Sequence, residues 1–376
     1  MTAHLSDDLN LPDDLNPRTD LNPHPSNASI AALRVKLNLL IDRLSESPNG
    51  ELMVNALASL TEIGNTDTDR LDLKILSATL LDIERAFKVL NPYRHTRKIS
   101  IFGSARTPVD APEYQLARDF AQRVTAEGFM VITGGGGGIM QAGNEGAGAG
   151  QSFGLNIHLP FEQGANDHIE GQDKLVTFKY FFTRKLFFLK ESDALAVFPG
   201  GFGTQDEIFE CLTLIQTGKS TPIPIVLIDK AGGDYWKNWV SYVEKNLLGQ
   251  GLISRDDLSL FTVTDRLDVA YDAIASFYQV YHSSRYVNEL LVIRLKSDLS
   301  DEAVHELNER FSDILVKGNI EKSSALPQEL QDETFMLPRL TLYFNQRDLG
   351  RMYEMIRAIN RLGDPDCLKN ACPEQK

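Results

Sequence analysis

The chain has 376 residues, 42% of them hydrophobic, and a formal net charge of −14. This is the composition of a globular protein, and the length allows one enlarged domain or two to three domains. The acidic balance argues against a nucleic-acid partner, because a phosphate backbone needs a basic surface; a local basic pocket could still bind a small anion. No apolar stretch is long enough to span a membrane, so we expect no membrane partner.

Three cysteines occur, at positions 211, 367 and 372. So few argue against a disulfide framework and favour a reducing, cytoplasmic location. Cys367 and Cys372 could form a redox pair, although two ordinary free thiols are the simpler interpretation. The N-terminal residues MTAHLSDDLN lack a basic segment followed by an apolar run, so we expect no signal peptide.

The N-terminal part of the chain divides into two regions by pattern. Residues 1–28 repeat a short Asp-Leu-Asn unit between prolines, which predicts a disordered acidic tail. In residues 29–96, leucines recur at helical spacing, for example at positions 33, 37, 40 and 44. We expect two or three helices there, packed onto the main domain or onto a second subunit.

Residues 97–282 alternate short β-rich runs with amphipathic helical stretches. The predicted strands are KISIFG, FMVITGG, SFGLNIHLP, KLVTF, ALAVFPGG and PIVLID. This alternation predicts an α/β fold, a Rossmann-like doubly wound parallel sheet covered by helices on both faces. Ligands of such sheets bind at the carboxyl ends of the strands, where the glycine clusters of this sequence fall.

Residues 286–363 predict a small α+β module. ELLVIRL and RLTLYFN have the pattern of strands, and DEAVHELNERFSDIL and DLGRMYEMIRAIN the pattern of helices. The predicted order β-α-β-β-α fits a ferredoxin-like or ACT-like unit. Such a module could serve regulation or assembly, or it could simply pack against the main domain.

Three predicted strand ends carry residues suited to binding an anion. Glycine lets a ligand approach the backbone closely, and the free N–H groups at a helix start attract negative charge. Two glycine loops at strand-to-helix junctions, with a serine at a third strand end, predict a phosphate site. The candidate phosphate-binding residues are Gly103, Ser104, Gly135, Gly136, Lys185, Gly200, Gly201, Gly203 and Thr204.

The common nucleotide motifs do not fit these loops. A Walker loop needs Lys and Ser or Thr after its glycines, but Ile139 and Met140 follow Gly138. The dinucleotide fingerprint should follow the first strand, where this sequence has GSAR. A nucleoside monophosphate therefore fits better than a dinucleotide.

Glu207 has two interpretations. The run Thr204-Gln205-Asp206-Glu207 matches a capping box, in which Thr204 caps a helix and Glu207 bonds back to the Thr204 N–H. If the same helix start holds a phosphate, a carboxylate there repels the anion unless a positive centre, such as a developing cation in the substrate, compensates. Arg184 and Lys185 precede the predicted strand ALAVFPGG, which leads into this helix. The planar guanidinium of Arg184 suits bidentate binding of a phosphate or a carboxylate.

These motifs resemble the LOG family, the cytokinin-activating phosphoribohydrolases, sometimes called lysine decarboxylases. The resemblance lies in GGGGGIM, in the Arg-Lys pair at 184 and 185 and in PGGFGTQDE, and covers about 97–282. Family members cleave the N-glycosidic bond of a nucleoside 5′-monophosphate. The resemblance implies that Arg184 and Glu207 are catalytic and that the glycine loops hold the phosphate. Gly137, where this branch often has proline, and Gln205, where leucine is usual, depart from the pattern.

The resemblance implies an enzyme that needs no cofactor or metal. His158 and His168 show no ligand spacing, and the sequence has no sign of a pyridoxal-phosphate site. Departure of the base would leave an oxocarbenium-like ribose that Glu207 could stabilise while it orients the attacking water. The family also implies a homodimer or a dimer-built oligomer. A non-catalytic nucleotide sensor on the same fold remains the main alternative, and a hydride-transferring oxidoreductase a more distant one.

Overall fold

The computed structural model describes residues 27–44, 46–159 and 164–363. Contacts divide the chain into two compact units, residues 1–80 with 159–162, and residues 81–158 with 163–376. Nearly all of the predicted acidic tail, and both Cys367 and Cys372, lie outside the described residues.

The first unit is helical. It contains α1 (Asn27–Leu44), α2 (Gly50–Asn65) and the first half of α3 (Arg70–Leu90). The second half of α3 belongs to the other unit, where Phe87 packs edge-on against Phe187 at 5.6 Å between ring centroids. The helices that the leucine spacing predicted between residues 29 and 96 are thus present.

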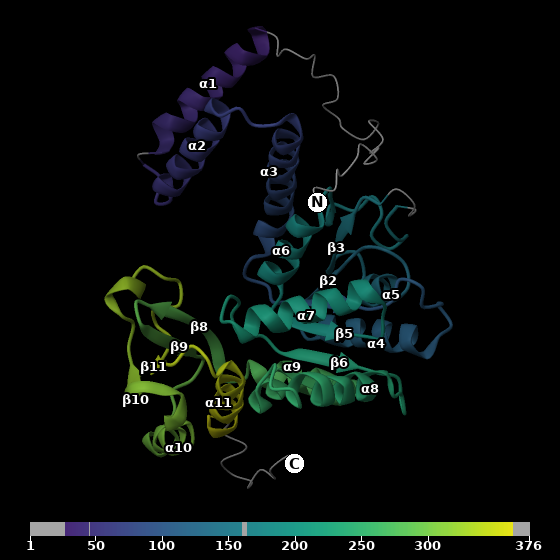
Figure 1. The fold of residues 1–376 in the computed structure, drawn as a ribbon, viewed down its shortest axis with the longest axis vertical. Coiled ribbons are helices and arrows are strands. Elements are labelled where there is room, and N and C mark those ends of the chain that lie inside the picture. The colour runs from purple at the N-terminus through teal and green to yellow at the C-terminus, as the bar shows by residue number, and fades with distance from the viewer. Residues whose placement is uncertain (1–26, 45, 160–163, 364–376) are drawn as a thin grey trace. The chain divides into compact units, whose positions relative to one another are not determined.

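The second unit contains a seven-stranded sheet in which every described pairing is parallel, with the strand order β4-β3-β2-β1-β5-β6-β7 (Figure 1). The Rossmann-like α/β prediction is confirmed. The strands are β1 (Lys98–Phe102), β2 (Met130–Thr133), β3 (Ser152–Ile157), β4 (Leu175–Phe178), β5 (Ala194–Val197), β6 (Ile225–Ile228) and β7 (Phe261–Thr264). The sequence analysis did not predict β7, whose four residues FTVT are all only half-buried.

Helices cover both faces of this sheet because side chains alternate along each strand. Ile99 and Ile101 of β1 belong to a core shared with helices α4 (Pro112–Ala126), α5 (Ile139–Ala147) and α9 (Leu267–Phe277). Phe102, one residue out of phase with them, packs at 4.9 Å from Phe188 of α6 (Phe181–Glu191). Phe187 and Phe188 of α6 are thus buried and supply packing, whereas Phe181 and Phe182 of the same helix are half-exposed.

A second, antiparallel sheet has the order β10-β11-β9-β8. Its elements are β8 (Tyr281–Val287), β9 (Leu290–Leu295), α10 (Asp301–Phe311), β10 (Leu315–Ser323), β11 (Arg339–Phe344) and α11 (Leu349–Leu362). The predicted order β-α-β-β-α lacked the leading strand β8. A ferredoxin-like unit is β-α-β-β-α-β; here the strand beside β9 comes first in the chain instead of last.

Helix α11 fixes this second sheet to the parallel sheet. The hydroxyl of Tyr353 donates to the carbonyl of Ile223 (2.8 Å) and accepts from its N–H (2.9 Å), just before β6. The amide of Asn360 accepts from the N–H groups of Val280 and Tyr281 at 2.8 and 2.9 Å. Buried polar groups are costly unless bonded, so these contacts set the position of α11 closely.

Candidate active site at the carboxyl ends of the strands

The strand order places the predicted loops at one point of the sheet. From β1 the chain runs outward through β2, β3 and β4, and then returns to the other side of β1 with β5. The carboxyl ends of β1 and β5 therefore border the point where the strand order reverses, which is where ligands bind in such sheets. The loops after β1, β2 and β5, together with the first turn of the helix that follows β5, carry eight of the nine predicted phosphate-site residues, and the ninth, Lys185, lies on α6.

Backbone hydrogen bonds join these three loops. The N–H of Ser104 donates to the carbonyl of Pro199 at 3.0 Å, which ties the loop after β1 to the loop after β5. The carbonyl of Ser104 accepts from the N–H of Ile139 at 3.0 Å, which ties the same loop to the start of α5. Ser104 is thus the joint between the two glycine loops.

Close packing explains why glycine is needed at three of these positions. A Cβ at Gly103 would lie 2.7 Å from two side-chain carbons of Ile139. A Cβ at Gly200 would lie 2.1 Å from Oγ1 of Thr204. Gly138 has φ of +61° and its Cβ would lie 2.2 Å from the carbonyl oxygen of Ser104. The loops therefore approach one another more closely than any side chain would permit.

Asn166 fixes the loop after β2, and the sequence analysis did not identify it. Its side-chain Nδ2 lies within hydrogen-bond distance of the carbonyls of Gly135 (3.0 Å) and Gly136 (2.9 Å) and of Oδ1 of Asn144 (2.9 Å). Its backbone N–H donates to Gly135 at 2.7 Å. No local pattern marks Asn166, because it lies 31 residues from Gly135 in the chain.

The loop after β5 leads into α7 (Phe202–Gln216), and the helix start corrects one prediction. Gly201 is the N-cap, so Thr204 lies inside the helix and is buried instead of capping it. The capping-box interpretation of Glu207 is therefore wrong. A Cβ at Gly201 or Gly203 would meet no atom within 4 Å, so the outer side of this helix start is open. N–H groups in the first turn of a helix have no intrahelical partner.

Glu207 is a buried carboxylate in the second turn of α7, with only 7% of its surface exposed. Its Oε2 has no hydrogen-bond partner among the described residues. Nζ of Lys185 lies 3.7 Å from this oxygen, which is an ion pair but too long for a hydrogen bond. Burial raises the pKa of Glu207, against the opposing charges of Lys185 and Arg184.

Lys185 lies among carboxylates. Its Nζ is 2.8 Å from Oδ2 of Asp206 and 2.6 Å from Oε2 of Glu210, besides the longer contact with Glu207. Burial by itself would lower the pKa of Lys185, but the bonds to Asp206 and Glu210 and the charge of Glu207 raise it. The structure thus places this predicted phosphate ligand against the acidic side chains of α7.

Arg184 lies against the loop after β2. Its Nε donates to the carbonyl of Leu155 at 2.7 Å, and its guanidinium lies 5.1 Å from the ring centroid of Phe188. A Cβ at Gly134 would lie 2.3 Å from its Nη2. The charge of Arg184 lowers the pKa of Glu207, so the two predicted catalytic residues interact electrostatically.

Tyr235 of α8 (Tyr235–Tyr242) also supports the loop after β5. Its hydroxyl donates to the carbonyl of Gly200 and accepts from Nε2 of Gln205. Within the described ranges, no group of three or more acidic, histidine or cysteine side chains could hold a metal ion. In the same part of the chain, no helix is long and apolar enough to cross a membrane.

Comparison with known proteins agrees with the motifs. Residues 140–274 match the family model described as possible lysine decarboxylase. The chain is 28% identical over 177 residues to the cytokinin riboside 5′-monophosphate phosphoribohydrolase of Mycobacterium tuberculosis, covering 46% of this chain and 90% of that protein.

Two solved structures are also similar. The molybdenum cofactor binding protein of Rippkaea orientalis has a TM-score of 0.34 and 18% identity, covering 48% of this chain and 96% of its own. The molybdenum cofactor carrier protein of Chlamydomonas reinhardtii has a TM-score of 0.35, with the same identity and coverage. The family match spans the loop after β5, Arg184 and Glu207. Residues 140–274 are therefore similar to the family described as possible lysine decarboxylase, and the similarity includes Arg184 and Glu207.

Proposed function

We propose that this protein hydrolyses the N-glycosidic bond of nucleoside 5′-monophosphates, AMP or an N6-modified AMP, to the free base and ribose 5-phosphate. The observation that carries the proposal is Glu207. A carboxylate that is buried in the second turn of the helix after a glycine loop, with no hydrogen bond on Oε2 from any described residue, costs stability unless it serves a ligand. The match to the family model and the similarity to a phosphoribohydrolase support this class of chemistry.

The glycine loops would bind the 5′-phosphate. The open helix start at Gly201 and Gly203 presents unpaired N–H groups, and the helix dipole favours an anion there. Gly135 and Gly136 would face the ligand from the loop after β2, and Ser104 joins the two loops. Binding energy from the phosphate, remote from the reacting bond, then fixes the ribose beside Glu207.

Glu207 would act on the sugar. As the bond between C1′ and the base nitrogen breaks, its electron pair leaves with the base and positive charge develops on the ribose. The carboxylate stabilises that charge and orients a water molecule, whose oxygen forms the new bond to C1′. The water gives up one proton, to Glu207 in the first instance, and the departing base takes up one. Arg184 would hold the phosphate or the leaving base.

We assign Lys185 to positioning the carboxylates of α7. Its Nζ already has two close carboxylate partners, so a phosphate would have to displace them. Lys185 contacts Glu207 directly, at 3.7 Å, and its charge opposes the rise that burial causes in the pKa of Glu207.

We further propose a cytoplasmic enzyme that works as a homodimer or a dimer-built oligomer. Apolar side chains near the site support this: Phe202 is 96% exposed at the start of α7, and Phe181 and Phe182 of α6 are half-exposed. Large exposed apolar groups mark interaction surfaces. Light scattering of the purified protein measures its mass directly, and a monomer at micromolar concentration would refute this part.

We also propose the division into a helical region at 29–96, a catalytic domain at 97–282 and an α+β module at 286–363. The two sheets lie in the last two of these segments, although β8 begins at Tyr281. Limited proteolysis followed by mass spectrometry of the fragments would test these boundaries.

Base release tests the proposed activity. We expect the purified protein to release adenine from AMP, detected by chromatography, and the isosteric variant Glu207→Gln to lose roughly 10²–10⁴-fold in kcat, as for other general acid–base groups. The exposed Glu244 provides a matched control, because Glu244→Gln makes the same chemical change on the surface. Equal rates of base release in wild type and Glu207→Gln would overturn the proposal.

The same experiment separates the enzyme from a nucleotide sensor. A sensor binds AMP, raising the melting temperature, but releases no base under any condition. We expect thermal stabilisation by AMP in both wild type and Glu207→Gln, with base release in wild type alone. A panel of purine and pyrimidine monophosphates then defines the base preference.

A further inference from the structure

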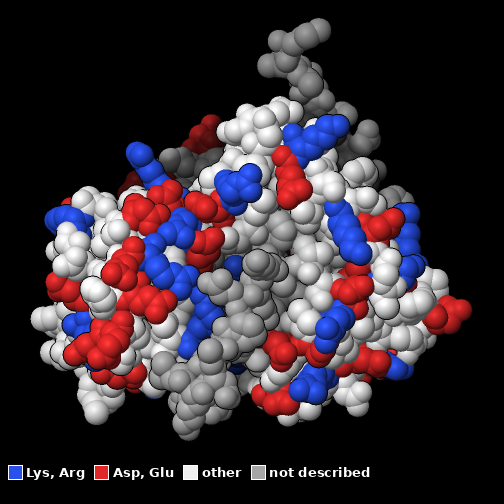
Figure 2. Space-filling model, turned by 90° about the horizontal axis from the view of Figure 1, so that it is seen from below, with Lys and Arg blue, Asp and Glu red and all other residues white. Residues whose placement is uncertain are grey.

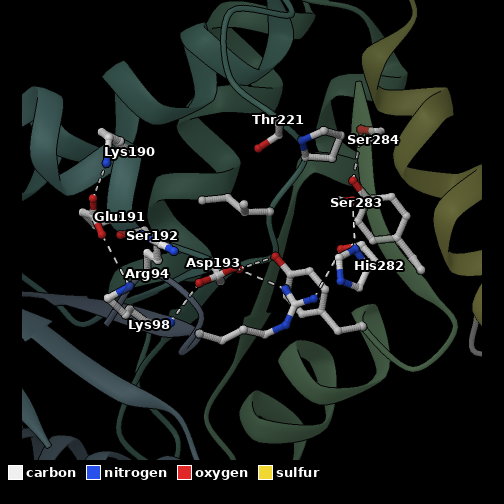
Figure 3. Close-up of a pocket in the computed structure, with 15 residues that line it drawn as sticks. Arg94, Lys98, Lys190, Glu191, Ser192, Asp193, Thr221, His282, Ser283 and Ser284 are labelled. Atoms are coloured by element: carbon white, nitrogen blue, oxygen red, sulfur yellow. Dashed lines mark hydrogen bonds and ion pairs between the residues drawn. The ribbon is translucent and has the colours of Figure 1, made fainter. Parts of the chain in front are cut away.

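A cavity of ≈ 260 Å³ lies at the amino ends of β1 and β5, between the parallel sheet and β8 (Figure 3). Its walls include Lys98 at the start of β1, Asp193 just before β5 and His282 of β8. The candidate active site lies at the other ends of the same strands. Strand β1 has five residues, so roughly 13 Å of strand separates the two sites. The cavity is therefore distinct from the nucleotide site.

The cavity gathers positive charge although the chain as a whole is acidic. On the face drawn in Figure 2, by contrast, acidic and basic side chains are interspersed. Four cations line the cavity against two carboxylates, which leaves two positive charges in excess. The cations are Arg94, Arg97, Lys98 and Lys190, and the carboxylates are Glu191 and Asp193.

Two of the cations form ion pairs with the two carboxylates of the cavity. Arg97 bonds to Asp193 at 3.2 Å and to the carbonyl of His282 at 3.3 Å, and its guanidinium lies 3.7 Å from the ring centroid of Tyr278. Lys98 pairs with Glu191 at 3.4 Å, and both side chains are almost wholly buried. These pairs balance the two carboxylates.

The other two cations keep donors for a ligand. Among the described residues, the side chain of Arg94 has one hydrogen bond, from Nε to His95 at 2.8 Å, so both of its Nη groups remain available. Lys190 contacts the carboxylate of Glu191, which Lys98 already shares, and its side chain is 47% exposed. Arg94 and Lys190 come from different elements and face the same space (Figure 3).

Hydroxyl groups complete the lining. Thr221 and Ser283 project toward the cavity from the loop before β6 and from β8 (Figure 3). Burial lowers the pKa of His282, and the charges of Arg97, Lys296 and Arg294 lower it further, as expected where the local potential is positive. Arginine, lysine and hydroxyl donors together are the groups that bind phosphate oxygens.

We propose that this cavity is a second anion site, which binds a small phosphorylated ligand carrying at least two negative charges. The two excess cations, Arg94 and Lys190, match that charge, and a guanidinium edge can bind two phosphate oxygens at once. The volume is below the roughly 300–1,000 Å³ of sites for drug-sized ligands, which indicates a ligand the size of pyrophosphate or a sugar phosphate.

Calorimetric titration of the full chain with pyrophosphate tests the site. Titrations at constant ionic strength, with and without saturating AMP, distinguish it from the glycine loops. We expect binding in both cases, and a roughly tenfold or larger weakening in Arg94→Ala/Lys190→Ala, because charged hydrogen bonds are removed. Parallel titrations with ribose 5-phosphate and inorganic phosphate show whether the ligand needs a sugar or a second phosphate.

The control variant Lys237→Ala/Arg347→Ala removes one exposed lysine and one exposed arginine that do not line the cavity. Its affinity for pyrophosphate should stay within about twofold of wild type, because distant surface charges are screened by salt. An equal loss in both variants, the absence of binding, or complete displacement of pyrophosphate by AMP would each overturn the proposal. If AMP alone fails to bind, the proposed nucleosidase function fails, while the pyrophosphate result still decides this site.

Discussion

Replacing Glu207 by glutamine should stabilise the protein at neutral pH while it abolishes base release. The substitution keeps the shape of the side chain and removes a charge from a position that is 7% exposed. The charged form loses hydration there, Oε2 has no hydrogen bond among the described residues, and the ion pair with Lys185 at 3.7 Å compensates only in part. Lys185 would keep Asp206 and Glu210 as partners after the change.

The magnitude follows from the cost of an unsatisfied buried group, about 1–3 kcal/mol, less the lost attraction to Lys185. A net gain of roughly 1 kcal/mol in the free energy of unfolding corresponds to about 2–4 °C in Tm for a domain of this size. Because burial raises the pKa of Glu207, the folded protein keeps this proton to a higher pH than the unfolded chain. The stability contribution is complete below the ordinary value of 4.5 and is lost as pH rises through the folded pKa.

Thermal unfolding of wild type and Glu207→Gln between pH 4 and 8 measures this difference. We expect the curves to agree near pH 4 and the variant to gain as pH rises. Glu210→Gln serves as the control, because Glu210 bonds to Lys185 at 2.6 Å and its removal should not stabilise. If the variant were less stable than wild type at pH 8, or if its gain in stability did not depend on pH, burial of the charged Glu207 carboxylate would not be what costs stability.

Three further substitutions test the loops and the docking of α11. Gly103→Ala forces a Cβ to 2.7 Å from Ile139 and should cost about 1–3 kcal/mol in urea unfolding; a cost below about 0.5 kcal/mol would contradict the packing. Asn166→Ala leaves the carbonyls of the loop after β2 without their amide donor and should cost about 2–3 kcal/mol, so unchanged stability would show that the loop holds itself. Tyr353→Phe unpairs both main-chain groups of Ile223 and should lower stability by about 1–3 kcal/mol without changing adenine release, whereas a slowed release would mean that α11 acts on the site.

The strands that the sequence predicted share strong local signals. Runs such as IVLI of β6 are apolar throughout and buried on both faces, so pattern alone identifies them. Strand β7 at the sheet edge and β8 of the second sheet were missed, because both mix polar and apolar residues and are only partly buried. Their pairing partners, and not their own composition, make them strands.

In the candidate site, too, local sequence identifies some features and contacts between distant residues decide the others. Arg184 and Glu207 could be selected from the motif, and in the folded chain the charge of Arg184 acts on the carboxyl of Glu207. The capping-box interpretation failed because a local pattern cannot say where α7 begins; the helix starts at Phe202 after Gly201, which puts Thr204 inside it. Lys185 was grouped with the phosphate ligands by proximity in sequence, and its partners on α7 are set by the packing of α6 against α7.

The sequence by itself determined the fold class, the glycine clusters at strand ends and the family resemblance, because each depends on neighbours a few residues apart. The tertiary structure decided which loops meet, since Ser104 joins Pro199 and Ile139 only after the strand order places β1 between β2 and β5. It also decided that Oε2 of Glu207 is buried without a hydrogen bond, and that Arg94 and Lys190 face one cavity. Such contacts join residues distant in the chain, and only the folded chain brings them together.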